Sequence, residues 1–490
     1  MKIAVIGSGA AAFGVFQGLA KRSEVQIDHF DPGQTPSDKL LPDGEPASWS
    51  RSQVASIYKS VRKHGGSGIP LPKSHFGDAP KQLSVDGKPR IWISDFPGGL
   101  THYWGGTMLP FLGADLEGWP FSAAELRPYY KHISSVVGVA GRADGLSELY
   151  GSDFITRPEI TAHPYLDRLA TTSHGARAGE ILFSLGLNRT ALETRQNSAN
   201  SCVSCGECMI GCFRGSTFST SQILNPRKST LPRVDRINEE VWRIDPDSGI
   251  VETRNSHMGT HGPYDRIFVA AGCLGTTGIV LRSNNDQRPV NFGDSFSFNV
   301  PLISFPQRGF DEFGAHFGLA NTLMVATDQT NGRCGAQAQI NPTVPHFWRS
   351  AVPSFLWELA NLAGYPLRRH LHWVRMYLPP VYANQYALTL NSDGRLTANY
   401  KPPENAKSEA RRILKAWDRT LRKKGYRLVL PLLSTGGTSS HYAASLSDHK
   451  RFNIDTQGNW GRRAIICDSS VWPETPVQSP TFTIMANAMR

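Results

Sequence analysis

Four of the chain's seven cysteines lie in one short stretch, as Cys202, Cys205, Cys208 and Cys212. The spacing C-x2-C-x2-C-x3-C is typical of a loop that wraps thiolates around an iron–sulfur cluster, 3Fe-4S or 4Fe-4S. Structural thiols or disulfides, and a zinc site, are the alternatives. Zinc is the weakest of these, because four ligands so close together leave little loop for a tetrahedral shell.

The fourth ligand of such a cluster stays open. In two-cluster ferredoxins the last cysteine of this run serves the other cluster, so a single run does not prove a complete four-ligand site. A three-iron cluster would need only three of the thiols. The cysteines that could complete the site are Cys212, Cys273, Cys334 and Cys467.

A glycine-rich turn near the N-terminus predicts a dinucleotide site. Residues 2–6 read as a buried parallel strand, Gly7, Gly9 and Ala12 form the motif G-x-G-x-x-A, and a small-residue helix follows. Gly7 permits the tight turn, Gly9 lets the backbone approach a pyrophosphate, and Ala12 allows close packing of helix on strand. The first turn of the helix offers free N–H groups to the phosphates.

A second predicted strand, residues 25–31, ends in Asp31. An acidic side chain at this place would bond the adenosine ribose hydroxyls, and it disfavours a 2′-phosphate. The motif does not separate FAD from NAD.

Two glycine pairs follow, Gly98 with Gly99 and Gly105 with Gly106. Paired glycines indicate backbone pressed close to a flat or phosphorylated group. Further on, a helix is expected after Ser122, which caps it together with Glu125 in a capping box.

Two later segments also predict a strand that is followed by a helix. Residues 266–270 read as a strand that ends in Ala271 and Gly272 and is followed by a helix, and a meander precedes them around Val241. Near the C-terminus a strand ends at Asp468, a proline-rich loop follows, and a final helix begins near Thr481.

In this order the motifs resemble the glucose–methanol–choline (GMC) oxidoreductase family, in its Cys-rich branch. The resemblance covers most of the chain: the G-x-G-x-x-A start with Asp31, the GG-L-T-x-x-W-GG loop, the AAG-C-L-G-T-T segment and the D-S-S-x-x-P…S-P-T terminus. It implies bound FAD, covalent or noncovalent. The residues it implies at the cofactor are Gly7, Gly9, Ala12, Asp31, Gly98, Gly99, Thr101, Trp104, Gly105, Gly106, Val241, Ala271, Gly272, Asp468, Pro480 and Thr481.

The resemblance also implies an α/β fold, with a Rossmann-like FAD-binding domain and an interleaved α+β substrate domain built on an antiparallel sheet. We expect the FAD-binding domain at 1–117, 200–290 and 431–490, with the Cys-rich loop at 201–214. The substrate or cap domain would take 118–199 and 291–430. A length of 490 residues agrees with more than one domain.

The chemistry that the family uses needs a base for the hydroxyl proton and a hydride acceptor, flavin N5. His441 matches the base, although Ala444 and Ser445 replace the usual Gly-Thr after it; a structural histidine is the alternative reading, and His449 is the next candidate. The second catalytic position falls at Ser479, a poor proton acceptor where the family has His or Asn. The adjacent Gln478 could take its place.

The net charge and the composition limit the kinds of binding partner and the cellular location that we expect. The net charge is +11, yet the densest basic stretch, 401–427, has helical spacing and is read as a solvated helix face rather than a surface for nucleic acid or an acidic partner. The chain begins with a strand and has no apolar run of 18 residues, so we expect no signal peptide, no membrane span and a cytoplasmic location.

The aromatic stretch 347–378 has two readings. It is expected to be a helical cap over the active site, and an interfacial segment that touches a membrane is the less favoured alternative.

Three functions remain open at this point. The expected one is a dehydrogenase that oxidises a hydroxyl of a sugar, polyol or other alcohol and passes electrons to an acceptor protein, with or without an iron–sulfur relay. The alternatives are an O2-using alcohol oxidase with structural cysteines, and a flavin-binding component of a larger complex without alcohol turnover.

Overall fold

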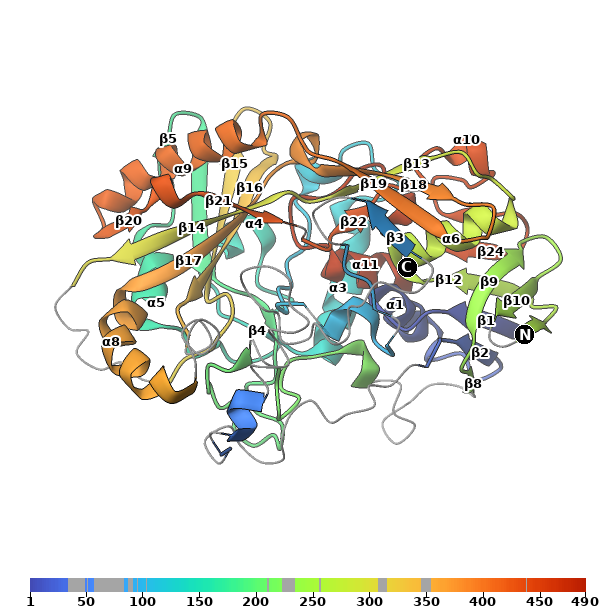
Figure 1. Cartoon of the computed structure of the whole chain (residues 1–490), viewed down its shortest axis with the longest axis horizontal. Helices are drawn as coiled ribbons and strands as arrows, with labels where there is room; N and C mark the ends of the chain where they lie inside the picture. The colour runs from blue at the N-terminus through green and yellow to red at the C-terminus, as the bar shows by residue number, and fades with distance from the viewer. Residues whose placement is uncertain are drawn as a thin grey trace.

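The computed structural model describes residues 1–33, 49–50, 52–56, 83–86, 91–94, 96–102, 104–208, 211–222, 234–254, 257–306, 315–344, 354–437 and 439–490. Figure 1 shows an elongated molecule, with the first strands of the chain at one end and a long, tilted sheet at the other. No helix in these ranges has the length and apolar character needed to cross a membrane.

The end that carries the N-terminus is built on a parallel sheet. Its described strands run in the order β23-β24-β12-β1-β2-β8, and only β23 pairs antiparallel. They are β1 (Lys2–Ile6), β2 (Gln26–Phe30), β8 (Val234–Ile237), β12 (Arg266–Val269), β23 (Asn459–Trp460) and β24 (Ala464–Ile466). The strands predicted at 2–6, 25–31 and 266–270 are therefore confirmed.

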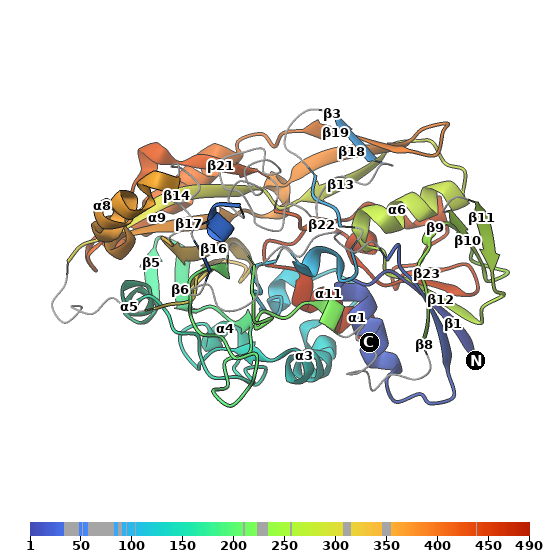
Figure 2. The same cartoon turned by 60° about the horizontal axis from the view of Figure 1, so that its bottom comes forward.

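The two ends of the chain meet on one face of this sheet. Helix α1 (Ala10–Leu19) follows β1, and the final helix, α11 (Thr481–Met489), lies against it in both Figure 1 and Figure 2. The approach requires glycine, because a Cβ on Gly14 would lie 2.3 Å from the carbonyl oxygen of Met485. The predicted C-terminal helix is confirmed.

The opposite side carries α6 (Gly272–Ser283) and a small antiparallel sheet. This sheet consists of β9 (Glu240–Asp245), β10 (Ile250–Arg254) and β11 (Met258–His261), so the predicted meander is confirmed and gains a third strand. Helix α6 packs on β9, and the Ser283 hydroxyl accepts the Ile244 N–H at 2.9 Å.

Helix α3 (Ala123–Val137) begins where the sequence indicates. The Ser122 hydroxyl accepts the Glu125 N–H at 3.2 Å, and the Glu125 carboxylate accepts the Ser122 N–H at 2.7 Å, so the capping box is confirmed. The same region holds α4 (Ser147–Tyr150), α5 (Pro164–Thr172) and the short pair β4 (Val139–Ala140) with β7 (Thr190–Ala191).

The other end of the molecule is an antiparallel sheet. Its described strands run β20-β14-β17-β16-β15-β6-β5, and β21 also pairs with β14. They are β5 (Ala176–Ala178), β6 (Ile181–Leu187), β14 (Ser297–Ser304), β15 (Thr322–Asp328), β16 (Cys334–Pro342), β17 (Leu371–Tyr377), β20 (Tyr426–Leu428) and β21 (Ser434–Gly437).

One face of this sheet is covered by the basic helix, α9 (Ala406–Arg422), as Figure 1 shows. Its apolar positions, among them Ile413, Trp417 and Leu421, are buried against the sheet, while Arg411 and Arg419 are exposed. The helix is amphipathic as the spacing predicts, and the reading of its charged face as merely solvated stays a prediction. The opposite face of the sheet, which carries Ser297, Gln337 and Tyr377, points away from α9 and is buried against other parts of the chain.

A third sheet joins the two ends. It runs β22 (Tyr442–Ala443), β13 (Val290–Asp294), β18 (Asn384–Leu390), β19 (Leu396–Lys401) and β3 (Leu83–Asp86), and β13 leads directly into β14. The short helix α10 (His449–Phe452) follows β22.

The prediction of a helical cap over 347–378 is partly wrong. Residues 347–353 lie outside the described residues, and α8 (Trp357–His370) is helical, but Leu371–Tyr377 is strand β17 in the middle of the antiparallel sheet. His372, Val374 and Met376 alternate inward at period two, and pairing with β14 and β16 outweighs the helical spacing of the aromatic residues. The predicted mixed α/β fold with an antiparallel second sheet is confirmed, whereas the domain boundaries stay a prediction.

Candidate active site

Four of the predicted cofactor residues lie at one edge of the parallel sheet. Gly7 follows β1, Asp31 follows β2, Ala271 follows β12, and Asp468 follows β24. The register pairs Ile6 with Phe30 and Val269, and Val269 with Ile466, so all four strands end together. In open α/β sheets, ligands bind at this carboxyl edge.

The turn between β1 and α1 has the shape that a pyrophosphate needs. Gly7 has φ +101°, its N–H donates to the Phe30 carbonyl at 2.8 Å, and a Cβ there would lie 2.4 Å from the Ala270 carbonyl oxygen. A Cβ on Gly9 would instead meet nothing within 4 Å. The backbone at Gly9 is thus open on the side where α1 begins, and Ala12 is fully buried.

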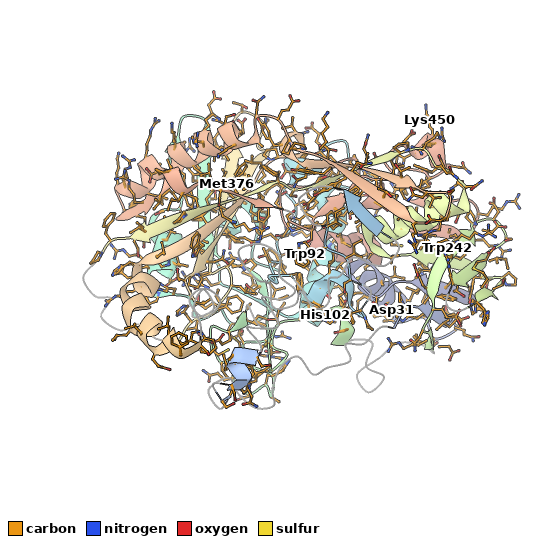
Figure 3. The ribbon with its side chains drawn as sticks, viewed as in Figure 1. Asp31, Trp92, His102, Trp242, Met376 and Lys450 are labelled. Carbon is orange, nitrogen blue, oxygen red and sulfur yellow. The ribbon has the colours of Figure 1, made fainter. Side chains whose placement is uncertain are left out.

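The loop with the first glycine pair is fastened to this turn. The Gly98 N–H donates to the Ser8 hydroxyl at 2.8 Å, and the Thr101 hydroxyl donates to the Gly98 carbonyl at 2.6 Å. Gly99 comes close to Gly9, since a Cβ on Gly99 would lie 3.4 Å from the Gly9 Cα. Figure 3 labels His102 at the end of this loop, and its Nε2 lies 2.5 Å from the Pro97 carbonyl oxygen. Two motifs that are 90 residues apart therefore form one surface.

The second glycine pair continues that surface toward the antiparallel sheet. The Trp104 indole N–H donates to the Phe218 carbonyl at 2.8 Å. Gly106 has φ +73° and accepts the Ala191 N–H at 2.7 Å, while a Cβ on Gly105 would meet nothing within 4 Å. Gly105, like Gly9, leaves open space beside the backbone.

The N-terminus of α6 completes this edge. Gly272 has φ +77° and a Cβ there would meet nothing within 4 Å. Asp468 is buried beside it and accepts hydrogen bonds from the Thr276 hydroxyl and, at 3.0 Å, from the Ser470 N–H. Burial raises the pKa of the Asp468 carboxyl. Val241 is buried in β9, and Pro480 precedes Thr481 at the start of α11.

His441 is held through its backbone by a buried carboxylate. Its N–H donates to Asp294 Oδ1 at 2.9 Å, and Ser439 donates to the same carboxylate through its N–H at 2.9 Å and its hydroxyl at 2.6 Å. Asn384 donates to it from the other side at 3.4 Å. Burial raises the pKa of Asp294 to about 6.

The His441 imidazole faces the antiparallel sheet. Its ring centroid lies 5.3 Å from that of Tyr377 on β17, with 32° between the planes. Burial, helped by the positive charge of Arg375, lowers the pKa of His441 to about 3, so the ring is neutral. Its Nδ1 is buried without a hydrogen-bond partner among the described residues. A neutral imidazole with a nitrogen that has no such partner can accept a proton.

Ser479 lies under the neighbouring strand of the same sheet face. Its N–H donates to Gln337 Oε1 at 3.3 Å, and its hydroxyl accepts the Gln339 amide at 3.5 Å. The Gln339 amide also lies 3.4 Å from the Thr107 hydroxyl, which directly follows Gly105 and Gly106. Strand β16 therefore joins Ser479 to the glycine loop.

The register brings the two candidate positions together. On β17 and β16, Tyr377 is opposite Gln337, and Arg375 is opposite Gln339. Hence the partner of His441 is next to the partners of Ser479, on the sheet face that α9 does not cover. The sequence does not indicate Arg375, Gln337 and Gln339 as site residues. The residues typical of strands within 371–377, Trp373, Val374 and Tyr377, are the signal that could have indicated the strand.

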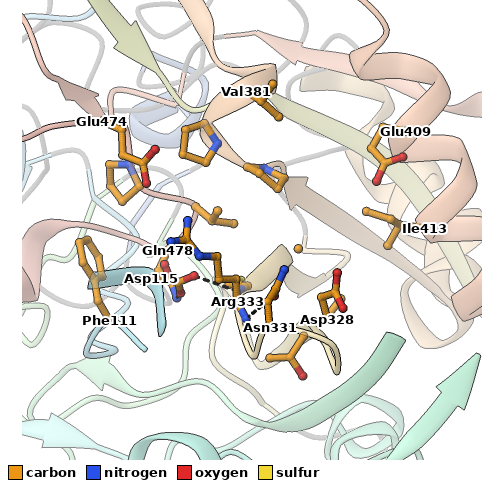
Figure 4. A pocket seen from close by; sticks show the side chains of 18 of the residues that line it. Phe111, Asp115, Asp328, Asn331, Arg333, Val381, Glu409, Ile413, Glu474 and Gln478 are labelled. Atoms are coloured by element: carbon orange, nitrogen blue, oxygen red, sulfur yellow. Dashed lines mark hydrogen bonds between the residues drawn. The ribbon is translucent and has the colours of Figure 1, made fainter. Parts of the chain in front are cut away.

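Gln478 turns to a different place. Its amide donates to Asp115 Oδ2 at 2.5 Å at the wall of a pocket of about 380 Å³, which Figure 4 shows. The other Asp115 oxygen accepts the Cys334 N–H at 2.9 Å, and burial raises the pKa of Asp115. Gln478 is thus engaged with Asp115, and His449 is in α10, away from β17 in Figure 1.

The four clustered cysteines come close to one another. The pKa of the half-buried Cys208 rises mainly through desolvation, and the thiols of Cys202, Cys205 and Cys212 add to the rise. The Sγ of Cys202 accepts the Ser204 N–H at 3.4 Å. All seven cysteines are free thiols, and among the described residues no group of three or more His, Cys, Asp or Glu side chains is placed to hold a metal ion. The expected iron–sulfur site is therefore not supported.

Comparison with known proteins bears on the fold. No family model and no curated protein matches the chain. Among solved structures, pyridoxine 4-oxidase from Mesorbium loti aligns with a TM-score of 0.61 at 12% identity over 100% of this chain and 97% of its own. An FAD-dependent oxidoreductase from Chaetomium thermophilum aligns at 0.59 and 11%, over 99% and 97%.

A formate oxidase from Aspergillus oryzae gives a TM-score of 0.60 at 13% identity, over 99% of this chain and 96% of its own. At such identities the likeness establishes the fold alone. The chain has the fold of pyridoxine 4-oxidase, formate oxidase and the FAD-dependent oxidoreductase, over its full length.

Proposed function

We propose that the chain is a GMC-type FAD-dependent oxidoreductase that oxidises a hydroxyl group of a small molecule to a carbonyl. The observation that carries the proposal is the placement of His441 and Ser479. Both contact the face of the antiparallel sheet that α9 does not cover, and Gln339 connects Ser479 to Thr107 at the end of the glycine loop.

The residues present fit FAD. Gly9, Gly105 and Gly272 leave open space beside the backbone, in places where side chains would fill a cradle. Asp31 follows β2 at the position for the ribose hydroxyls, and α1 begins at the pyrophosphate position. Gly105 and Gly106 would face the ring system. Bound FAD would supply the acceptor for the hydride.

The chain's own groups supply the remaining chemistry. The neutral His441 imidazole accepts the hydroxyl proton, and a tilted ring contact with Tyr377 helps to keep the imidazole in place. Ser479 and the Gln337 amide, whose Nε2 is buried without a partner among the described residues, offer hydrogen bonds to the substrate oxygen. Ser479 orients the hydroxyl and leaves proton removal to His441.

Two versions of this function differ in the group that accepts the electrons from the reduced flavin. The expected version is a dehydrogenase that passes electrons to a partner protein. Direct use of O2 is the second candidate, since two of the structural neighbours are named as oxidases. Because no metal-ligating group of three or more side chains is found among the described residues, no electron route through the Cys-rich loop forms part of the proposal.

Anaerobic mixing with a panel of hydroxyl compounds tests the proposal. Bleaching of the flavin absorption by at least one of them supports hydroxyl oxidation, and reoxidation by O2 or only by an artificial acceptor then separates oxidase from dehydrogenase. Purified protein without flavin, or flavin that no compound reduces, would contradict it.

A further inference from the structure

The carboxylate of Asp115 connects three segments of the chain near the candidate site. Asp115 lies in a short 3-10 helix, Gly113–Leu116, which follows the glycine loop in sequence. Its Oδ2 accepts the Gln478 amide at 2.5 Å, and its Oδ1 accepts the Cys334 N–H at 2.9 Å. Each oxygen therefore binds a different segment, the C-terminal loop in one case and the start of strand β16 in the other.

Both of these segments carry parts of the candidate site. Gln478 directly precedes Ser479 in the C-terminal loop. Cys334 begins the strand that carries Gln337 and Gln339. The Ser479 N–H donates to Gln337 Oε1 at 3.3 Å, and the Ser479 hydroxyl accepts the Gln339 amide at 3.5 Å. The contact between Ser479 and β16 is thus formed by the same two segments that the carboxylate holds together.

The two partners of this carboxylate are both buried N–H donors. Gln478 is 1% exposed and Cys334 is 3% exposed. A bulge between Ala326 and Thr327 on β15 interrupts the strand ladder beside Cys334, and here the Cys334 N–H donates to the carboxylate. An ionised carboxylate has an acceptor oxygen for each donor. An amide in its place would turn its own N–H groups toward one of the two donors, which would lose its acceptor at a cost to stability.

The surroundings of Asp115 supply a matched comparison. Asp115 and Asp328 both line the pocket of about 380 Å³ that Figure 4 shows. The Asp328 carboxylate accepts the Thr330 N–H at 2.8 Å and the Thr330 hydroxyl at 2.6 Å, within its own turn. The printed partners of Asp115 instead belong to the two segments that meet at Ser479.

We propose that Asp115 is a positioning residue for Ser479. Its carboxylate fixes the C-terminal loop against the start of β16, and this sets the place of the Ser479 hydroxyl beside the Gln337 amide, where the substrate oxygen binds. The inference rests on the proposed function, in which Ser479 orients the substrate hydroxyl. Asp115 acts through Ser479 and not on the substrate.

A double-mutant cycle tests this relationship in the flavin-loaded protein. The measured quantity is the efficiency of anaerobic flavin reduction, which is the limiting rate divided by the substrate dissociation constant, with the most active compound of the panel. Ser479→Ala and Asp115→Asn should each lower this efficiency about 10-fold. The double variant should be at most about twofold less efficient than Ser479→Ala, because Asp115 acts through that hydroxyl. Asp328→Asn is the control and should match wild type.

An exchange of the two polar groups gives a second measurement. Gln478→Glu alone places two carboxylates together and should lower the efficiency. When it is combined with Asp115→Asn, the new amide donates to the new carboxylate and keeps its oxygen for the Cys334 N–H, so part of the lost efficiency should return. Flavin content reports whether each variant is folded. If Asp115→Asn holds no flavin, Gln478→Ala replaces it in the cycle, since it removes the same hydrogen bond.

Three results would overturn the inference. They are an unchanged efficiency in Ser479→Ala or Asp115→Asn, losses that multiply in the double variant, and no recovery in the exchange. The proposed function fails by different results, namely flavin that no hydroxyl compound reduces, or flavin reduction that is unchanged in a His441 variant.

Discussion

The backbone N–H of His441 donates to Asp294 at 2.9 Å, although the two residues are 147 positions apart. This contact joins the loop of the candidate base to strand β13 and predicts a pH effect. Only ionised Asp294 accepts from all its donors, and burial raises its pKa to about 6. His441, whose pKa is lowered to about 3, stays neutral over the same range.

We therefore expect the rate of flavin reduction to fall as the pH drops below about 6, because protonation turns one accepting oxygen of Asp294 into a donor. In Asp294→Asn the rate of flavin reduction should be low at every pH, and the fall in this rate near pH 6 should disappear. The pH profile of anaerobic flavin reduction measures both. An unchanged acid limb in the variant would assign it to another group.

A second prediction concerns the cradle at the glycine loop. Gly105→Val should lower the flavin content of the purified protein strongly, since the side chain enters space that the flavin ring needs, while no described atom opposes it. Gly113→Val is the matched control, because Gly113 is exposed on a neighbouring turn and has similar free space. Equal flavin content in the two variants would place the ring elsewhere.

A third prediction concerns the support of that loop. Arg189 is buried, and its guanidinium binds both oxygens of Asp144, at 2.7 and 3.0 Å, while its backbone carbonyl accepts the Met108 N–H at 2.7 Å. Breaking this pair by Asp144→Ala leaves a buried charge and should cost about 3–5 kcal/mol of apparent unfolding free energy. Chemical denaturation measures the loss.

Glu117→Ala is the control for this stability measurement. Glu117 is 79% exposed in its ion pair with Arg333 and should contribute less than about 1 kcal/mol. A loss in Asp144→Ala no larger than in Glu117→Ala would show that the buried pair does not support the loop.

A fourth prediction separates the cysteines from hydroxyl oxidation. Cys205→Ser removes the exposed thiol of the cluster, and the rate of flavin reduction by substrate should stay within about twofold of wild type, since the described site contains no cysteine of this loop. Iron and acid-labile sulfide analysis of anaerobically purified protein accompanies it. A large fall in the rate would mean that the loop takes part in the reductive step.

The sequence predicts the cofactor edge better than the substrate face. Gly7, Asp31, Ala271 and Asp468 each follow a strand that is recognisable locally, and parallel register brings strand ends together without further information. The capping box at Ser122 is likewise local.

The substrate face depends on long-range pairing. Arg375 reaches the site because β17 lies between β14 and β16, and neither neighbour can be inferred from the residues around it. Because the sequence analysis predicts a helical cap over 347–378, it does not predict strand β17. Ser479 was predicted from its place before Pro480, but its contacts with Gln337 and Gln339 required the fold.

The central claim is that His441 takes the hydroxyl proton, and stopped-flow measurement of anaerobic flavin reduction tests it most directly. With the most active compound of the panel, His441→Asn should reduce its flavin about 10²- to 10⁴-fold more slowly than wild type, at normal flavin content. His449→Asn, in the separate helix α10, should match wild type. Flavin reduction at the wild-type rate in His441→Asn would contradict the account.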